Sequence, residues 1–234
     1  MTNKLLYILT VLCCAISITC SAAGGKCGKH VKWKWDPETA VLTITGTGKM
    51  NDYAYHTLNK RPWHKKRNEI KSFVIDKGVT HIGNNAFSSC DKLESIKVDA
   101  ANANYCDIDG VLFTKDKATL LQYPKGNRKS IYVLPTTVTK IADHAFFSCD
   151  WLQEVILPEG LAEIDSWAFL GCDLLKQILI PASVTKMGYG VFYMCNKLTE
   201  VKYPMGLDIS QISVYASTNL IPYDPQKSPS GGQP

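Results

Sequence analysis

Three stretches of the 234-residue chain decide its fold because they are copies of one another. They read TKIADHAFFSC at residues 139–149, AEIDSWAFLGC at residues 162–172 and TKMGYGVFYMC at residues 185–195. Their phenylalanines, Phe146, Phe169 and Phe192, follow one another at intervals of 23 residues, as do the cysteines that end each stretch. A fixed period of this length predicts a solenoid, in which each short coil buries its apolar side only against its neighbours.

A fourth copy, THIGNNAFSSC at residues 80–90, is displaced from the other three. Phe87 and Phe146 are 59 residues apart, which is one period of 23 plus 36 residues, so one coil carries an insertion of 36 residues. Within the insertion, Val111–Phe113 and Thr119–Tyr123 flank a polar Lys-Asp-Lys segment, which predicts a β-hairpin on the solenoid. Asp107–Gly110, just before it, is expected to form a turn.

Each coil repeats the same order of apolar and turn residues. A leucine follows the cysteine, and a short alternating run then predicts a strand, as in Glu154–Leu157 and Gln177–Ile180. A proline such as Pro181 ends the strand because it cannot donate to the ladder. A second apolar pair, such as Val184 and Met187, predicts another extended side, and the phenylalanine of the corner fills the interior. We therefore predict a mainly β solenoid with short helical or 3-10 turns and a curved parallel sheet along one face.

The order of Ile-Gly or an equivalent, Ala-Phe, Cys, Leu and a strand ending in Pro resembles the BspA-like family of bacterial leucine-rich repeat surface proteins. The resemblance covers about residues 27–207 and includes a segment before the first repeat that is a cap in this family. The residues that carry this part are Cys27, Gly28, Trp33, Leu42–Gly48, Met50, Asp52, Tyr53, Pro62 and Trp63. Ala142, Met187 and Val191 depart from the usual Gly, Ile and Ala. The resemblance implies a leucine-rich repeat solenoid with an N-terminal β cap, and an exported adhesion or ligand-binding module instead of an enzyme.

These patterns divide the chain into four parts. We predict a signal peptide at residues 1–23, an N-terminal cap at 24–70 and leucine-rich repeats at 71–207, with the hairpin insertion at about 99–127. Residues 208–234 are expected to hold the remnant of a C-terminal cap and a disordered tail, because their last ten residues are rich in Pro, Gly and Ser. An open solenoid end exposes a sheet edge and a bare core, so residues 205–222 have to cover it.

The N-terminus has the pattern of an export signal. Lys4 precedes the uncharged, mostly apolar run Leu5–Ala23, and the small residues Ser21, Ala22 and Ala23 suit a cleavage site after Ala23. Lipid attachment at Cys20 is an alternative that the residues before this cysteine fit poorly, and retention as an uncleaved membrane anchor is another. We expect a secreted or bacterial cell-surface protein that contacts the membrane only through such an N-terminal anchor.

The nine cysteines do not have the spacing of a disulfide framework. Three of them fall in the signal segment, while Cys90, Cys149, Cys172 and Cys195 occupy one repeat position. A cysteine that recurs at one position of a coil is best interpreted as a small buried packing residue, so we predict free thiols there. Cys27 and Cys106 remain unassigned.

Alternation along the strands selects a candidate partner site. If Val155 and Leu157 point inward, their neighbours point outward, and the same register applies to the adjoining coils. The site consists of Ile131, Val133, Glu154, Ile156, Gln177 and Leu179. Adjacent parallel strands lie about 5 Å apart, so Val133, Ile156 and Leu179 form an apolar stripe on a concave face of about six strands, flanked by the other three. Such a patch tends to mark a partner site, which predicts a protein or peptide ligand unless the hairpin or the C-terminal tail covers the stripe.

Other functions have weaker support in the sequence. The net charge is only +5, and we interpret the basic cluster Lys60, Arg61, Lys65, Lys66 and Arg67 as a solvated loop, not a nucleic-acid site. The five histidines have no metal-ligand spacing, and Asp107 with Asp109 fits a turn better than a calcium loop. Phosphate-loop and nucleophile-elbow motifs are absent, so we predict no catalytic residue, no metal and no cofactor.

Glycan binding is the main alternative to a protein ligand, with a hydrolase as a third class. The cap contains Trp33, Trp35, Tyr53 and Tyr55, whose rings are of the kind that stacks on sugars. The competing interpretation places these rings in the core of the cap. A hydrolase would require carboxylates that converge on one point, and the sequence shows no such constellation.

Overall fold

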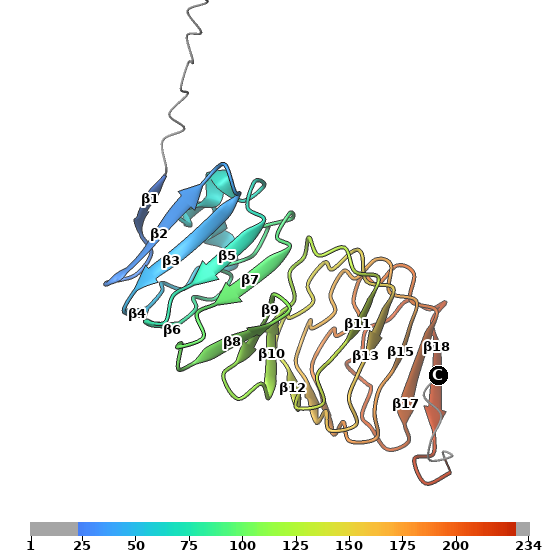
Figure 1. Cartoon of the computed structure of the whole chain (residues 1–234). Coiled ribbons are helices and arrows are strands. Elements are labelled where there is room, and N and C mark those ends of the chain that lie inside the picture. The colour runs from blue at the N-terminus through green and yellow to red at the C-terminus, as the bar shows by residue number, and fades with distance from the viewer. Residues whose placement is uncertain (1–22, 228–234) are drawn as a thin grey trace, which may run out of the picture.

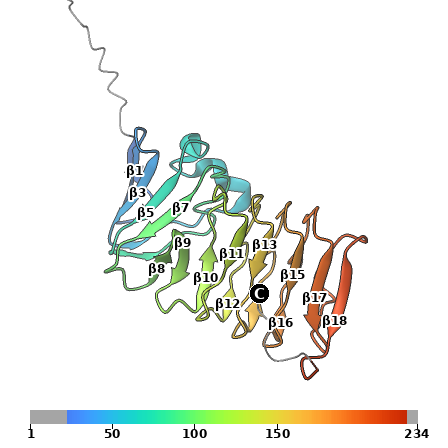
Figure 2. The ribbon, with the colours of Figure 1, turned by 45° about the vertical axis from the view of Figure 1, so that its right-hand side comes forward.

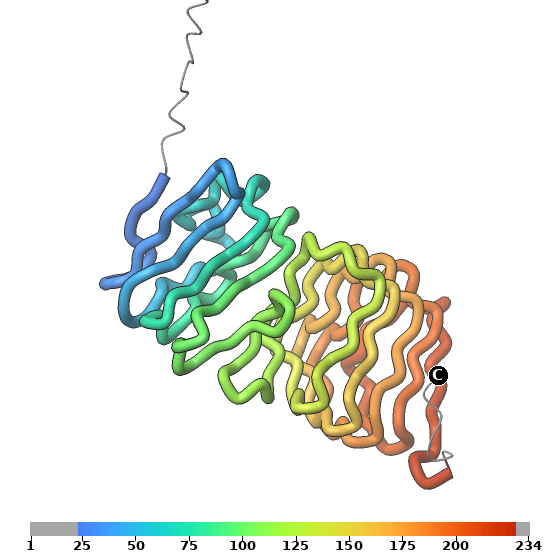
Figure 3. The backbone as a smooth tube through the Cα atoms, in the orientation of Figure 1, coloured from blue at the N-terminus to red at the C-terminus, as the bar shows by residue number. Residues whose placement is uncertain are grey.

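The chain folds into an elongated solenoid of short coils, described in a computed structural model for residues 23–227 (Figures 1 and 3). The predicted signal peptide, except Ala23, and residues 228–234 of the predicted tail lie outside this range. The helices of the described part are two short 3-10 helices, η1 (Tyr55–Lys60) and η2 (His64–Lys66). The predicted mainly β solenoid with short 3-10 turns is therefore confirmed.

The N-terminal cap is an antiparallel start to a sheet that then becomes parallel. Its strands, with those of the first coils, are β1 (Gly24–Lys26), β2 (Val31–Asp36), β3 (Val41–Gly46), β5 (Ser72–Ile75) and β7 (Ser95–Val98). β1, β2 and β3 pair antiparallel, whereas β3 pairs parallel with β5, and β5 with β7. Alternating Val31, Trp33 and Trp35 face the core of the cap because side chains of a strand point to opposite faces in turn.

A second parallel sheet runs along the C-terminal half. Its strands are β11 (Ile131–Val133), β13 (Glu154–Ile156), β15 (Gln177–Leu179), β17 (Glu200–Pro204) and β18 (Asn219–Tyr223). They lie side by side along the solenoid axis in this order (Figure 2). The register pairs residues one period apart, such as Val133 with Ile156 and Leu179 with Lys202, so the 23-residue repeat is also the ladder register.

A further sheet forms another side of the coils and takes up the insertion. Its strands are β8 (Tyr105–Ile108), β9 (Val111–Thr114), β10 (Thr119–Gln122), β12 (Lys140–Ile141), β14 (Glu163–Ile164) and β16 (Lys186–Met187). β9 and β10 form the predicted hairpin, and β10 pairs parallel with β12. Asp107 and Ile108 end β8 and so lie outside the turn expected at Asp107–Gly110, which is confined to Asp109 and Gly110. In the cap, β4 (Gly48–Lys49) pairs with β6 (Val79–His81).

The insertion interrupts the sheet, so the expectation of one open face of about six strands is wrong. β7 ends the first sheet, and β11 begins the second. The outer N–H groups of β7 would bond to the strand of a next coil, but the insertion accepts them: Ile96 donates to the Gly110 carbonyl at 2.8 Å and Val98 to Asp107 Oδ1 at 2.8 Å. With these donors used, no strand adds to β7.

Aromatic rings and thiols stack through the core of the repeats. Phe146 and Phe169 stack with ring centroids 4.7 Å apart, and Phe192 follows at 5.4 Å. The thiol of Cys172 donates to the Phe146 carbonyl at 3.1 Å, and burial raises the pKa of this thiol well above its usual range. All six cysteines of the described range are free, and Cys90, Cys149, Cys172 and Cys195 are buried, as predicted.

The C-terminal strand β18 protects the edge of the sheet. Asn219 donates to the Thr199 carbonyl at 2.9 Å, and the Tyr223 carbonyl accepts from Met205 at 2.8 Å, so these residues turn their backbone toward β17. The alternate residues, Leu220 and Pro222, turn theirs to the free edge. Because proline has no N–H, this edge offers few donors for the addition of another strand.

Candidate ligand-binding face

The six predicted site residues lie on one face of the second parallel sheet. Side chains of Ile131, Val133 and Leu179 are 51%, 60% and 53% exposed, Gln177 is exposed, and Glu154 and Ile156 are half-buried. The register places Ile131 beside Glu154, and Glu154 beside Gln177. The alternation that separates outward from inward residues is therefore present in the structure, with Tyr132, Val155 and Ile178 buried on the opposite face.

Val133, Ile156 and Leu179 form a continuous apolar row across β11, β13 and β15. The hairpin that was a possible cover belongs to the sheet of β12, β14 and β16. β18, the other possible cover, extends the sheet beside β17 and does not cross the row. Up to residue 227, the row is thus open to a partner.

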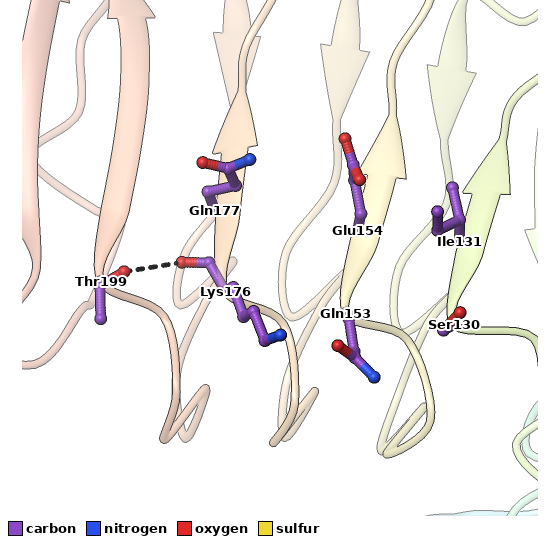
Figure 4. A pocket seen from close by; sticks show the side chains of 7 residues that line it. All are labelled: Ser130, Ile131, Gln153, Glu154, Lys176, Gln177 and Thr199. Atoms are coloured by element: carbon purple, nitrogen blue, oxygen red, sulfur yellow. Dashed lines mark hydrogen bonds between the residues drawn. The ribbon is translucent and has the colours of Figure 1, made fainter.

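A polar depression lies next to the apolar row, at the start of the same strands (Figure 4). It encloses about 420 Å³. It is lined by Ser130, Ile131, Gln153, Glu154, Lys176, Gln177 and Thr199. Three of the predicted residues, Ile131, Glu154 and Gln177, belong to it, whereas Val133, Ile156 and Leu179 stand farther along the strands. Hydroxyl, amide, carboxylate and ammonium groups thus adjoin a row of aliphatic side chains.

Backbone hydrogen bonds hold the floor of the depression. The amide of Gln153 donates to Ser130 at 2.7 Å, that of Lys176 to Gln153 at 3.1 Å, and that of Thr199 to Lys176 at 2.9 Å. The Thr199 hydroxyl donates to the same Lys176 carbonyl at 3.1 Å, as drawn in Figure 4. Because every coil is tied to the next, the side chains above this floor keep fixed spacings. Such preorganisation lowers the entropy lost when a ligand binds.

Strand alternation missed four residues of the depression. Ser130, Gln153, Lys176 and Thr199 each precede a strand, where alternation no longer predicts the direction of a side chain. They are nevertheless spaced by 23 residues, so the repeat period, carried one residue back from each strand, was the signal that would have found them.

The charges on this face nearly balance. Glu154 and Lys176 lie in the depression, and Lys202 pairs with Glu200 at 3.1 Å on the adjacent strand. Within residues 23–227, no three His, Cys, Asp or Glu side chains are grouped to hold a metal ion. The face is therefore suited to contacts with neutral polar and apolar groups more than to a strongly charged partner.

The cap places its aromatic residues differently from the glycan hypothesis. Trp33, Trp35 and Tyr53 are buried, at 8%, 1% and 7% exposure, and only Tyr55 of the four is exposed, at 77%. Trp63, fully buried, packs edge-on against Trp33 and Tyr53 with ring centroids 6.2 and 5.7 Å away. Trp33, Trp35 and Tyr53 therefore belong to the core of the cap and present almost no surface to a sugar.

Arg61 and Asp107 lie in other surroundings than the sequence predicts. Arg61 is 2% exposed and sits between η1 and η2, so the basic cluster is not simply a solvated loop. The carboxylate of Asp107 accepts from Val98 at 2.8 Å and from Lys97 at 3.2 Å, which ties the insertion to β7.

Within the described residues no helix has the length and apolar character needed to cross a membrane.

Comparison with known proteins agrees with this architecture. The family model for the BspA type leucine-rich repeat region matches residues 63–132 and 121–227, in six copies. A leucine-rich repeat protein from Eubacterium ventriosum has a similar structure, with a TM-score of 0.50 and 18% identity over 87% of this chain and 85% of that one. No curated protein sequence matches the chain.

Two further solved structures share less of the chain. A leucine rich cell surface protein from Faecalibacterium prausnitzii has a TM-score of 0.49 and 24% identity, over 71% of this chain and 53% of that one. The pneumococcal vaccine antigen PcpA has a TM-score of 0.49 and 26% identity, over 57% and 38%. The family model spans well over half of the sequence, and the repeats it describes are the coils of the solenoid. The chain therefore belongs to the family of proteins built from BspA-type leucine-rich repeats.

Proposed function

We propose that this chain is an exported binding protein that holds a protein or peptide ligand on the face of β11, β13, β15 and β17. The observation that carries the proposal is the open apolar row of Val133, Ile156 and Leu179 beside a preformed polar depression. Exposed contiguous apolar surface is costly to leave in water and tends to mark a partner site.

The two halves of the face suit the two halves of a peptide. Apolar side chains of a ligand would pack on the row, where burial stabilises the complex by roughly 25 cal/mol per Å² of apolar surface. Gln153, Gln177 and Thr199 carry amide and hydroxyl groups that can bond to the ligand's backbone or polar side chains. The row supplies affinity, and the depression fixes the position of the ligand along the solenoid.

Peptide selection tests the proposal and finds a ligand at the same time. A displayed random-peptide library is selected on the chain lacking residues 1–23, and the selected peptides are measured against Ile156→Ser/Leu179→Ser. We expect at least about tenfold weaker binding, because each buried apolar anchor contributes on the order of 1 kcal/mol or more. A control, Tyr189→Ser/Met194→Ser, removes two exposed apolar side chains elsewhere and should bind as the unchanged chain does.

Peptides that bind both double variants equally would show that the apolar row is not the site. The melting temperatures of the two variants are compared first. All four substituted positions are at least partly exposed, so neither variant should lose its fold.

We also propose that the protein is secreted or displayed on a bacterial cell surface. The support is the export pattern of residues 1–23, together with the membership of the BspA-type leucine-rich repeat family, which includes bacterial surface proteins. Mass spectrometry of the protein from the cytoplasm, membrane and medium of its host decides whether it is exported and how it is attached. A mature N-terminus at Gly24 supports secretion, a diacylated N-terminal Cys20 supports lipid attachment, and an intact cytoplasmic chain contradicts export.

A further inference from the structure

The coils have a third side, distinct from the sheet of β11, β13, β15 and β17 and from the sheet of β12, β14 and β16. In each coil it follows β12, β14 or β16. It comprises residues 143–149, 166–172 and 189–195 in successive coils. Backbone bonds join the coils here too: Phe146 donates to Ala168 at 2.8 Å and Phe169 to Val191 at 3.0 Å. Because these bonds fix the backbone, the outward side chains of this side stand in rows at the coil spacing of about 4.8 Å.

Five aromatic side chains gather on the outside of this third side. We call them the aromatic corner: His144, Phe147, Trp167, Tyr189 and Tyr193. The indole of Trp167 meets the Tyr189 ring at 4.8 Å and 72° and the Tyr193 ring at 5.9 Å and 76°. His144 is 6.4 Å from Trp167 on the other side and 5.8 Å from Phe147. Tyr189 and Tyr193 are 52% and 49% exposed, so their rings border solvent.

The fold does not require an aromatic residue at the repeat position of His144 and Trp167. Asn85, His144, Trp167 and Gly190 are equivalent and all have a left-handed backbone, with φ of 57°, 56°, 58° and 64°. Asn and Gly adopt this conformation readily, whereas a bulky residue does so at a cost in strain. The coil thus needs only an Asn or Gly at this position, and Trp167 adopts the left-handed backbone there at a cost in strain. Side chains kept at strained positions are frequent at ligand sites.

Gly190 leaves room for the indole of Trp167 because it has no side chain. A Cβ atom at this position would lie 2.4 Å from Cζ3 of Trp167, so the ring rests against the bare backbone of the next coil. This contact holds the indole in one orientation. A ring held in this way presents a ready-made platform to a ligand and loses little entropy on binding.

Hydrogen-bonding groups surround the rings. Ser166 Oγ accepts from the Tyr189 amide at 3.0 Å and keeps its own proton to donate. Nδ1 of His144 bonds to Asp143 at 2.7 Å, which leaves Nε2 for a ligand. The hydroxyls of Tyr189 and Tyr193 add further donors and acceptors, since both residues are about half exposed.

The corner carries no excess of positive charge. The cation beside it is Lys125, whose Nζ lies 5.9 Å from the centre of the Phe147 ring and pairs with Asp91 at 3.0 Å. Asp143 adds a negative charge at the rim. Because Lys125 is already paired with a carboxylate and Asp143 is negative, the charges placed beside the corner favour a neutral ligand over an anionic one.

We propose that the aromatic corner is a binding site for a neutral oligosaccharide. A pyranose ring has C–H groups on its faces and hydroxyls around its rim. Its faces would pack on Trp167 and the tyrosine rings, while its hydroxyls bond to Ser166, His144 and the phenols. The site lies on another side of the coils than the proposed peptide face, so the two proposals stand or fall separately.

Titration with defined sugars tests the site. The chain lacking residues 1–23 is titrated with chito-, cello- and manno-oligosaccharides and with a heparin oligosaccharide, and tryptophan fluorescence and heat are recorded. The key variant is Trp167→Asn, which installs the residue found at the equivalent position 85 and so keeps the left-handed backbone. The matched control is Trp151→Asn, since Trp151 is 47% exposed but stacks on Arg128 outside the corner.

We expect at least one neutral oligosaccharide to bind, Trp167→Asn to weaken its binding about tenfold or more, and Trp151→Asn to leave it unchanged. The proposal is overturned if no neutral sugar binds, if heparin alone binds, or if the two variants behave alike. Should Trp167→Asn fail to fold, Tyr193→Ser removes a half-exposed ring of the same corner and decides the question by the same comparison.

Discussion

Arg61 is the one charged side chain that is fully buried between residues 23 and 227. Its guanidinium donates to the carbonyls of Leu58, Asn85 and Ala86 at 3.2, 3.0 and 3.1 Å, while Nη2 has no partner. Each carbonyl accepts a second bond: from the Arg61 amide, from Ser88 and from Trp63 Nε1, each at 3.2 Å. Removal of the guanidinium would therefore leave none of these carbonyls unpaired.

Two substitutions of Arg61 separate its volume from its charge. In Arg61→Met the lost charge-assisted bonds, about 1.5–3 kcal/mol each, are offset by relief of a buried charge that lacks a carboxylate partner. We expect unfolding free energy within about 1 kcal/mol of the unchanged chain. In Arg61→Ala a cavity remains, which lowers the unfolding free energy by roughly 2–4 kcal/mol. Urea unfolding measures both, and an equal loss in the two variants would show that the guanidinium itself holds the cap.

Local patterns reveal the cysteines but not Arg61. The thiols at 149, 172 and 195 are predictable because their spacing is that of the coil, which already implies a common buried position. The burial of Arg61 depends on carbonyls 24 and 25 residues away in the first coil. In a cluster of five basic residues, nothing in the sequence distinguishes the buried one from its solvated neighbours.

At the scale of elements, ion pairs link the short strands β12, β14 and β16. Glu163 of β14 bonds to Lys140 of β12 at 3.2 Å and to Lys186 of β16, and Lys140 also pairs with Asp165 at 2.9 Å. The ammonium of Lys186, with that of Lys140, lowers the pKa of Glu163 from its ordinary range to about 2. Strands of two residues have few backbone bonds, so this ladder supports their pairing.

The lowered pKa of Glu163 predicts an acid-sensitive contribution to stability. An unfolded glutamate titrates near pH 4.3, so the contribution is complete above about pH 5 and is lost as the pH falls toward 2. Glu163→Gln should lower the melting temperature at pH 7, by the equivalent of roughly 0.5–1 kcal/mol, and leave it unchanged near pH 2. Scanning calorimetry across this range checks it, with Glu159→Gln, outside the ladder, as control. An effect of Glu163→Gln that persists at pH 2 would contradict the electrostatic origin.

The elements themselves follow from the sequence wherever the period holds. Glu154–Ile156 and Gln177–Leu179 lie in register because residues one period apart must stack, and this places the apolar row. The period says nothing about the insertion. Its hairpin is visible as two apolar runs, but the bonds from Ile96 to Gly110 and from Val98 to Asp107 depend on a three-dimensional approach. The aromatic corner lies within the period but outside the strands, where alternation does not predict the direction of a side chain.

At the scale of the whole molecule, the insertion divides the interior into two cores that meet at β9. One core holds the cap and the first coils and includes Leu112. The other extends through the later coils to Ile212 and includes Val111 and Phe113. Alternation along β9 thus sends neighbouring side chains into different cores. A solenoid gains stability from contacts between adjacent units, so this strand controls how far unfolding of one end affects the other.

Substitutions at neighbouring positions of β9 should therefore destabilise opposite ends of the protein. Leu112→Ala and Phe113→Ala each remove a side chain that is at most 2% exposed, at a cost of roughly 2–5 kcal/mol. Hydrogen exchange followed by mass spectrometry should show faster exchange in β5 and β7 for Leu112→Ala, and in β10, β12 and β13 for Phe113→Ala. The distal strands β15 and β17 should be unaffected by Leu112→Ala, because several coils separate them from the damaged core. If both variants accelerate exchange equally along the entire chain, the two cores unfold as a single cooperative unit and β9 is not a boundary between them.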